Sequence, residues 1–328
     1  MHNTAQLLLL DKNGIDALTN PAEVLDAVRE SFILHSRGNG RLFPVIRERL
    51  ASGGVFGIKS GDVGTQGLLG FKAAGFWPDN RRSGGEPHQA TILLIDPETG
   101  RPLCVLDGNA ITTVRTGAAG GLGLQRLARA DSKHLCVFGT GIQAQIQSRF
   151  ALQLMPQLKS LRYLSHGGQR SKIFEAAVDD AARSIGCIVT CASDPDATVA
   201  SSDIVITATP GKAALFSWEA VQPGTHLTCV GTDTAGKREL PEGLLKHARL
   251  IVDDAIQARS IGELQWAQDT HCLQLGDLLT HKHPFSRQDD DITVFDMTGI
   301  ALQDLTVARL LMNKAQSTGT GLLVPWPW

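Results

Sequence analysis

The 328-residue sequence lacks a strong net charge of either sign. Its 31 Lys and Arg residues nearly balance its 33 Asp and Glu residues, which gives a net charge of −2. Nucleic acids and acidic membrane surfaces attract proteins with an excess of basic residues, so neither is expected as a partner. Hydrophobic residues at 42% and charged residues at 20% are typical of ordinary soluble proteins. At this length two domains are expected, since one hydrophobic core rarely serves so many residues.

Long apolar segments are missing near the start of the chain. The longest run there, residues 7–10, stops at Asp11 and has no basic flank. It is therefore predicted to be neither a signal peptide nor a membrane span. We expect a cytoplasmic protein.

The cysteines lack any clustering. Four of the six lie in apolar, strand-like runs, and none joins histidines at the spacing of a zinc site. Without an export signal they are expected to be reduced thiols, most of them in the core, and no metal site is predicted. The six are Cys104, Cys136, Cys187, Cys191, Cys229 and Cys272.

A dinucleotide-binding pattern is present in the middle of the chain. Residues 135–138 form a short apolar run suited to a buried parallel strand, and a G-x-G-x-x-A segment follows at once. The first glycine permits a tight turn, the second lets a pyrophosphate approach the backbone, and the alanine lets the next helix pack closely. That helix directs its free N–H groups at the phosphates. The predicted cofactor-binding residues here are Gly139, Thr140, Gly141, Ile142, Gln143 and Ala144.

Two kinds of periodicity divide the chain. After a helix that starts at Asn20, the runs at 42–50, 55–59, 68–76, 91–95 and 103–106 predict an α+β module with a mostly antiparallel sheet. Residues 109–127 predict a helix whose glycines would permit close packing. From 135 on, short apolar strands alternate with helices, which predicts an α/β fold with a doubly wound parallel sheet of the Rossmann type.

One feature of such a unit is missing, namely the acidic residue that usually follows the second strand and binds the ribose of NAD. The segment after that strand instead holds Ser165, His166 and Arg170. Arg170 and the small polar residues could accept a 2′-phosphate, which favours NADP over NAD. Alternatively, Arg170 is a solvated surface charge.

Four charged residues outside this pattern are candidates for substrate chemistry. Lys72 lies in an apolar strand, Arg115 on the helix before the dinucleotide pattern, and Arg47 after residues 43–46. Asp233 follows a strand at the carboxyl edge, where ligands of open α/β sheets bind. Arginines and a lysine can bind a carboxylate, and an aspartate can move a proton. By periodicity alone, the lysine is more often an edge residue and the aspartate a turn residue.

The motifs around these residues resemble the ornithine cyclodeaminase/mu-crystallin family over nearly the whole chain. The resemblance implies a homodimer. It also implies a substrate-binding and dimerisation domain, residues 1–125 with 300–328, and a Rossmann domain, residues 126–299. The matching segments are 70–72, 88–91, 107–116, 139–141, 230–240 and 298–304.

The resemblance also assigns roles by position. Lys72 and Arg115 match the residues that hold the substrate's α-carboxylate. Arg47 matches a further carboxylate ligand, although Arg41 and Arg49 are close by. Asp233 matches the catalytic acid/base. Beside the G-x-G-x-x-A segment, the predicted cofactor contacts are Thr91, Arg115 and Thr116, and Lys72 is predicted to be catalytic as well as substrate-binding.

Three activities fit the family. Differences at 88–91 and 108–109 from the cyclodeaminases favour the reductase branch, in which NAD(P)H reduces a 2-imino acid to an L-amino acid. Iminosuccinate, which gives L-aspartate, is one candidate; its second carboxylate would need another cation, and Arg81 and Arg82 are available unless they form a solvated loop. The alternatives are an ornithine cyclodeaminase using bound NAD and a mu-crystallin-like NADP-dependent binding protein.

Overall fold

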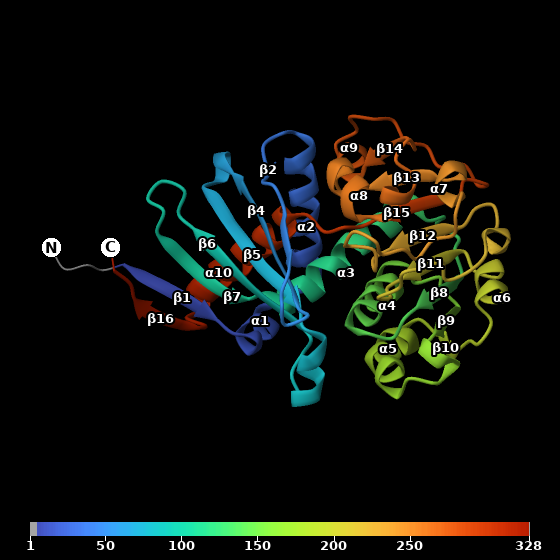
Figure 1. Ribbon diagram of the computed structural model, residues 1–328, viewed down its shortest axis with the longest axis horizontal. Helices are drawn as coiled ribbons and strands as arrows, with labels where there is room; N and C mark the ends of the chain where they lie inside the picture. The colour runs from blue at the N-terminus through green and yellow to red at the C-terminus, as the bar shows by residue number, and fades with distance from the viewer. Residues whose placement is uncertain (1–4, 328) are drawn as a thin grey trace. The chain divides into compact units, whose positions relative to one another are not determined.

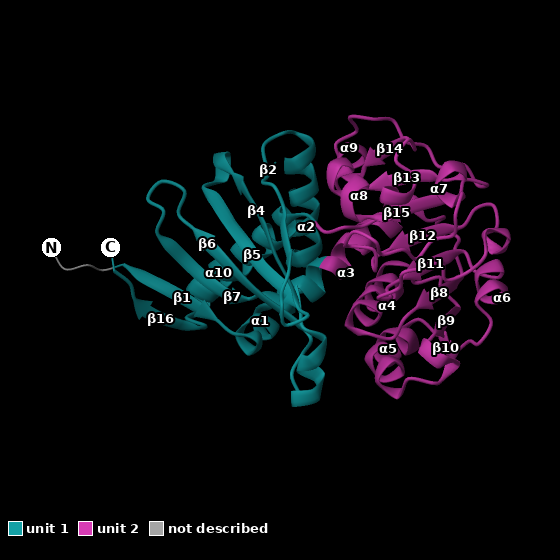
Figure 2. Ribbon diagram, viewed as in Figure 1, with its two compact units in different colours: residues 1–115, 300–328 teal, residues 116–299 magenta. Residues whose placement is uncertain are grey.

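The computed structural model describes residues 5–327 and divides the chain into two units (Figure 1, Figure 2). Unit 1 comprises residues 1–115 and 300–328, and unit 2 comprises residues 116–299. The first boundary falls inside helix α3 (Gly108–Leu127), where the sequence had suggested residue 125. One continuous helix therefore contributes residues to both units.

The sheet of unit 1 has the strand order β16-β1-β7-β6-β5-β4-β2, and β3 also pairs with β4. All of these pairs are antiparallel except β1 with β7. The strands are β1 (Gln6–Leu10), β2 (Arg41–Leu42), β3 (Ile46–Arg49), β4 (Val55–Val63), β5 (Leu68–Phe76), β6 (His88–Ile95), β7 (Pro102–Asp107) and β16 (Leu322–Pro325). The helices of this unit are α1 (Lys12–Leu18), α2 (Pro21–Ser36) and α10 (Ala301–Thr318), with the start of α3.

One face of this sheet, the inner face, packs against α10, which also contacts α2 (Figure 1). The period-2 alternation of β5 places Leu68 and Lys72 on that face as buried residues, while Phe71 between them is only half-buried on the opposite, outer face. A glycine at position 70 lets α10 approach closely, since a Cβ there would lie 2.9 Å from a methyl group of Leu305. The inner face is thus a tight helix–sheet interface.

The predicted strand at 42–50 is wrong as a single element. The structure has two short strands, β2 and β3, separated at residues 43–45. Pro44 lies in this interruption, and a proline has no N–H to give to a sheet ladder. The sequence analysis also missed β1, β14 and β16, whose apolar runs are short and have little alternation.

Unit 2 confirms the predicted doubly wound parallel sheet. Its strand order is β10-β9-β8-β11-β12-β15-β13-β14, and every pair is parallel. The strands are β8 (His134–Phe138), β9 (Ser160–Leu164), β10 (Ile188–Cys191), β11 (Ile204–Thr207), β12 (His226–Cys229), β13 (Arg249–Val252), β14 (Cys272–Gln274) and β15 (Thr293–Asp296). The helices are α4 (Ile142–Leu154), α5 (Lys172–Ser184), α6 (Pro195–Ala200), α7 (Leu244–His247), α8 (Ala255–Ile261) and α9 (Leu275–Leu279).

The glycines of α3 have the packing role that the sequence allowed. A Cβ on Gly117 would lie 2.6 Å from the ring of Phe150, and one on Gly120 would lie 1.9 Å from the side-chain oxygen of Gln147. Both neighbours belong to α4. Glycine therefore lets α3 approach α4 closely, and larger residues at these positions would force the helices apart.

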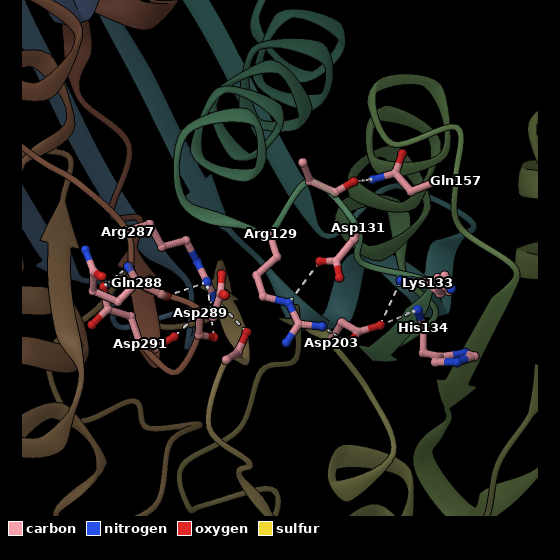
Figure 3. A network of polar contacts seen from close by, with 12 residues as sticks. Arg129, Asp131, Lys133, His134, Gln157, Asp203, Arg287, Gln288, Asp289 and Asp291 are labelled. Carbon is pink, nitrogen blue, oxygen red and sulfur yellow. Dashed lines mark hydrogen bonds and ion pairs between the residues drawn. The ribbon is translucent and has the colours of Figure 1, made fainter.

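A network of polar contacts joins segments at the N-terminal ends of the unit 2 strands (Figure 3). Asp203, just before β11, accepts hydrogen bonds from the backbone N–H groups of Lys133 and His134 at 2.7 and 2.9 Å and from Arg129 at 3.1 Å. Arg287 donates to backbone carbonyls at the ends of several other segments, which include those of Leu127, Gly224 and Asp291. These hydrogen bonds tie together the N-terminal ends of the strands. Ligands of such sheets bind at the opposite, carboxyl ends.

Across residues 5–327, no helix combines the length and the apolar character needed to cross a lipid bilayer.

Candidate functional site

The dinucleotide pattern lies between β8 and α4, where the strand order reverses between β8 and β11. Gly139 has a φ of +103°, a conformation that residues with a Cβ rarely adopt. A Cβ there would also lie 2.5 Å from the carbonyl oxygen of Ala208 after β11. The first glycine of the pattern is therefore required by the fold itself.

Gly141 differs from Gly139, because nothing in the fold demands a glycine there. It is the N-cap of α4 with an ordinary φ of −72°, and a Cβ on it would meet no atom within 4 Å. Among the described residues no side chain caps the first turn of α4, so its first N–H groups lack a capping acceptor. An uncapped helix N-terminus with an approachable backbone is suited to binding a phosphate group.

Gly141→Val is expected to weaken dinucleotide binding at least about tenfold, or about 1.4 kcal/mol, because the new side chain would occupy the space in front of α4. The melting temperature should change little, since valine can adopt the backbone conformation found at this position. Isothermal titration with NAD and NADP measures the effect. Gly64→Val, which adds a side chain in a turn of unit 1 with nothing within 4 Å, is the control. Unchanged affinity in the Gly141 variant would rule out the assigned pyrophosphate position.

The other predicted cofactor-binding residues near this loop are divided between surface and core. Ile142 is exposed, Gln143 is half-buried, and Ala144 is fully buried where α4 packs on the sheet. The carbonyl of Thr140 accepts a hydrogen bond from Gln145 at 3.0 Å. Thr116 is buried in α3, and its carbonyl accepts a hydrogen bond from Gln147 of α4 at 2.7 Å.

The segment after β9 provides an acid that the sequence analysis had overlooked. Arg170 lies at the surface, and its guanidinium forms hydrogen bonds of 3.1 and 2.7 Å with the two carboxylate oxygens of Glu175. Glu175 also accepts a hydrogen bond from Tyr163 at 2.6 Å, and these donors hold its pKa below the usual value. Ser165 and His166 precede this pair in an exposed turn. Arg170 is thus neutralised within the chain.

In unit 1 the structure brings Lys72 and Arg115 together on one buried carboxylate, that of Asp304. Lys72 Nζ lies 2.7 Å from Asp304 Oδ2, and Arg115 Nε lies 2.9 Å from Asp304 Oδ1. Arg115 also donates to Gln303 Oε1 at 2.9 Å, and Lys72 donates to Thr112 at 3.2 Å. The side chains of Lys72 and Asp304 are 5% and 0% exposed. This arrangement is the cation cluster: Lys72, Arg115, Gln303 and Asp304.

Burial governs the charge states in the cation cluster. Desolvation lowers the pKa of Lys72 to about 7, and the charge of Arg115 adds to that effect, while Asp304 opposes it. Burial also pushes the pKa of Asp304 upward, but the charges of Arg115 and Lys72 outweigh it and the net shift is downward. Asp304 therefore stays ionised, and the carboxylate fixes both cations.

The remaining candidates in unit 1, for substrate and for cofactor binding, lie on both faces of the sheet and in a surface turn. Arg47 pairs across the sheet with Gly57 of β4, which places it on the same inner face as Lys72. Thr91 pairs with Ala73 and is exposed on the outer face. Arg41 is bound to Asp62, Arg49 is exposed on β3, and Arg81 and Arg82 lie in an exposed turn.

In unit 2, Asp233 lies in the loop after β12 and forms an ion pair with Lys237 at 2.7 Å. Its side chain is 45% exposed. Lys237 also donates to the carbonyl of Gly231 at 3.1 Å. One lysine therefore contacts both Gly231 and Asp233 within this loop. The carboxylate is accessible but held in one place.

Two buried glutamates support this loop. Glu239 accepts hydrogen bonds from Gly231 N at 2.9 Å and from Thr209 N at 2.7 Å, and burial raises its pKa. Glu263 accepts from Thr232 Oγ1 at 2.5 Å, and burial raises its pKa to about 7. Each glutamate thus joins the loop after β12 to another segment of unit 2.

Sequence reasoning assigned no role to Asp304, Lys237, Glu239 or Glu263. The signal for Lys237 was its spacing of four residues from Asp233. Asp304 was visible as an acid within a mostly apolar helical stretch. Among the described residues, no group of three or more His, Cys, Asp or Glu side chains is arranged to hold a metal ion.

Comparison with known proteins gives consistent matches. The model of the ornithine cyclodeaminase/mu-crystallin family matches residues 6–319. Iminosuccinate reductase of Paracoccus denitrificans is 32% identical over 320 residues, which cover 95% of this chain and 98% of that protein.

Two solved structures agree with that match. The structure of the same Paracoccus enzyme in complex with NAD⁺ has a TM-score of 0.87 and 30% identity, covering 98% of this chain and 99% of that one. An archaeal alanine dehydrogenase dimer with bound NAD has a TM-score of 0.90 and 28% identity, covering 98% and 100%. With the Gly139–Gly141 loop and the cation cluster in place, the chain belongs to the ornithine cyclodeaminase/mu-crystallin family.

Proposed function

We propose that the protein is an NAD(P)H-dependent imine reductase that converts a 2-imino acid to an L-amino acid. The observation that carries this proposal is the cation cluster, in which one buried carboxylate holds Lys72 and Arg115 side by side. Two fixed cations suit the α-carboxylate that every 2-imino acid carries, since Arg offers paired N–H donors and Lys a point charge.

Gln303 adds a further donor to this cluster. Its Oε1 is bound by Arg115, while its buried Nε2 has no hydrogen-bond partner among the described residues. A buried amide N–H without an acceptor costs free energy, on the order of 1–3 kcal/mol. A substrate carboxylate oxygen beside Arg115 would satisfy it, which supports this location for the α-carboxylate.

The cofactor is proposed to bind at the loop from Gly139 to Gly141 and the uncapped start of α4. When bound, a reduced nicotinamide supplies a hydride to the imine carbon. We propose NAD rather than NADP: Glu175 already neutralises Arg170, the residue on which a 2′-phosphate site would depend. The NAD complexes of the two similar proteins support the same choice.

Asp233 is proposed to assist protonation of the imine nitrogen. Reduction of a C=N bond places electron density on nitrogen, so the nitrogen must be protonated before or during the step. The carboxylate of Asp233 can hold a protonated iminium, and Lys237 keeps it in place. A protein that only bound the cofactor would have no need of an acid here.

Iminosuccinate, which gives L-aspartate, is the proposed substrate, and the similarity to the Paracoccus enzyme supports it. A test measures NADH and NADPH oxidation with 2-oxo acids plus ammonia or methylamine, with oxaloacetate and pyruvate in the panel. Oxidation should require both the oxo acid and the amine and should be faster with NADH. Conversion of ornithine to proline and ammonia with NAD, without reduction of any imine, would identify a cyclodeaminase instead.

A homodimer is proposed as the active form. The outer face of the unit 1 sheet is apolar and only half-buried in the single chain, and such patches commonly mark an interface. Light scattering should give twice the chain mass of 35.1 kDa, and a single-chain mass would exclude the dimer. The half-buried apolar residues include Phe56, Ile58, Phe71, Leu93 and Val105.

A further inference from the structure

The side chain of Glu239 reaches back to the start of the loop that carries Asp233. Its Oε2 accepts a hydrogen bond from Gly231 N at 2.9 Å and one from Thr207 Oγ1 at 2.8 Å. Its Oε1 accepts from the backbone N–H and from the hydroxyl of Thr209, both at 2.7 Å. Thr207 is the last residue of β11, and Gly231 follows β12, the neighbouring strand. One carboxylate therefore joins the carboxyl ends of two parallel strands, where ligands of such sheets bind.

These four donors suit Glu239 as an ionised carboxylate, which only accepts hydrogen bonds and has about four positions for them. The side chain is fully buried. Burial raises its pKa, and the hydrogen bonds act in the opposite direction. The Thr209 hydroxyl accepts a hydrogen bond from Gly211 N at 3.1 Å, so its own proton is left for Glu239. An amide in place of this carboxylate would set an NH2 group against two donors.

Gly231 shows how closely the loop is fitted to this carboxylate. A Cβ on Gly231 would lie 2.2 Å from the carbonyl oxygen of Thr209 and 2.5 Å from Glu239 Oε1. A larger residue would therefore push the chain away from Glu239. Lys237 donates to the carbonyl of Gly231 at 3.1 Å and to Asp233 Oδ1 at 2.7 Å. A shift of Gly231 would thus displace the carboxylate of Asp233 as well.

Glu263 holds the other end of the same loop. Its Oε1 accepts hydrogen bonds from Glu239 N at 2.6 Å and from Thr232 Oγ1 at 2.5 Å. Glu239 is fixed through its backbone by Glu263 and through its side chain by the residues at the end of β11. The loop is therefore held at its beginning and at its end, and Asp233 lies between these points.

We propose that Glu239 is a positioning residue, which fixes the carboxylate of Asp233 where the imine nitrogen is protonated. This inference rests on the proposed reductase function, since it assumes that Asp233 assists that protonation. A displacement of about 1 Å at a reacting group can cost on the order of a hundredfold in rate. Lys237 is the link, because it contacts both Asp233 and the backbone that Glu239 holds.

The first test follows the loop without any turnover. In Glu239→Gln, the amides of residues 230–240 should exchange with solvent at least about tenfold faster, because the start of the loop loses its acceptor. Hydrogen exchange read by mass spectrometry measures this, and peptides that cover α5 should exchange as in the parent. Asp203→Asn is the matched control, because that carboxylate also accepts backbone N–H groups but lies at the opposite ends of the strands. Unchanged exchange in residues 230–240 of the Glu239 variant would overturn the proposal.

The second test asks whether Glu239 acts through Asp233. Glu239→Gln should lower kcat on the best imine at least about thirtyfold, while KM and the dissociation constant of NAD change less than about threefold. In a protein that already carries Asp233→Asn, the same change should lower kcat less than about threefold further, because residues that act as a unit are not additive. Thr207→Val, which removes one of the four donors, should give a smaller loss of kcat and covers the case of a Glu239 variant that does not fold.

The outcomes separate this inference from the reductase function. Equal losses of kcat with and without Asp233→Asn would make Glu239 a structural residue and contradict the proposal, while the reductase function stands. Faster exchange in residues 230–240 with an unchanged kcat would contradict it too. If the parent reduces no imine, the reductase function fails, whereas faster exchange confined to this loop would still show that Glu239 holds Asp233 in place.

Discussion

Asp304→Asn is expected to destabilise the protein by about 3 kcal/mol at pH 7, the order of loss seen when one partner of a buried ion pair is removed. The change keeps the shape of the side chain but leaves Lys72 and Arg115 buried together without their carboxylate. Urea denaturation measures the loss. Asp62→Asn, which breaks the partly exposed pair with Arg41, should cost less than about 1 kcal/mol.

The loss should also depend on pH in a defined direction. Without Asp304, the pKa of Lys72 falls below its present value of about 7, further from the unfolded value near 10.4. A lysine whose folded pKa is depressed costs stability in the range between the two values, and the cost grows as the pH falls. The extra loss in the variant should therefore stay constant between pH 7 and pH 10, where folded Lys72 is deprotonated in both proteins, and should grow as the pH falls below about 7, where only the parent's Lys72 takes up a proton. A loss that does not deepen below pH 7 would mean that Asp304 does not act through Lys72.

The same variant should also bind substrate poorly. Because Asp304 positions both proposed carboxylate ligands, KM for the imine should rise while cofactor affinity is retained. A variant with lower stability but an unchanged KM would show that Asp304 has only a structural role.

Asp233→Asn is expected to reduce turnover on the best imine by roughly two orders of magnitude or more, within the range typical of lost acid–base assistance. Asparagine keeps the size and much of the hydrogen bonding, but it has no charge to hold an iminium. Cofactor binding, followed by fluorescence titration, should remain near normal. Asp180→Asn, at a fully exposed position on α5, is the matched control. Turnover within about threefold of the parent would make Asp233 a turn residue and would contradict the proposed mechanism.

The parts of the site that the sequence predicted are those determined by neighbouring residues. The Gly139 turn and the start of α4 were predicted from six consecutive residues. The strands of unit 2 were predicted from short apolar runs. The pairing of Arg115 with Asp304 joins positions 189 residues apart, and Thr232 and Glu263 are 31 apart. Such contacts depend on the tertiary fold, and the hydrophobic periodicity of the sequence does not predict them.

Lys72 and Arg170 show two other limits. Alternation placed Lys72 in a strand, but it could not tell an edge lysine from one buried under a helix. Glu175 is only five residues from Arg170, yet the intervening N-cap at Ser171 changes the chain direction. A search for an acid directly after β9 therefore missed a carboxylate that the start of α5 brings back to it.

Helix α10 has a consequence for how the protein is made. It follows the whole of unit 2 along the chain, yet it covers the inner face of a sheet whose strands β1 to β7 emerge first from the ribosome. At about 5–20 residues per second, those strands wait roughly 10–40 s for their covering helix. Unit 2 is continuous in sequence and can fold in that interval. The nascent sheet, with its lysines and leucines uncovered, is the stage at which a chaperone would matter most.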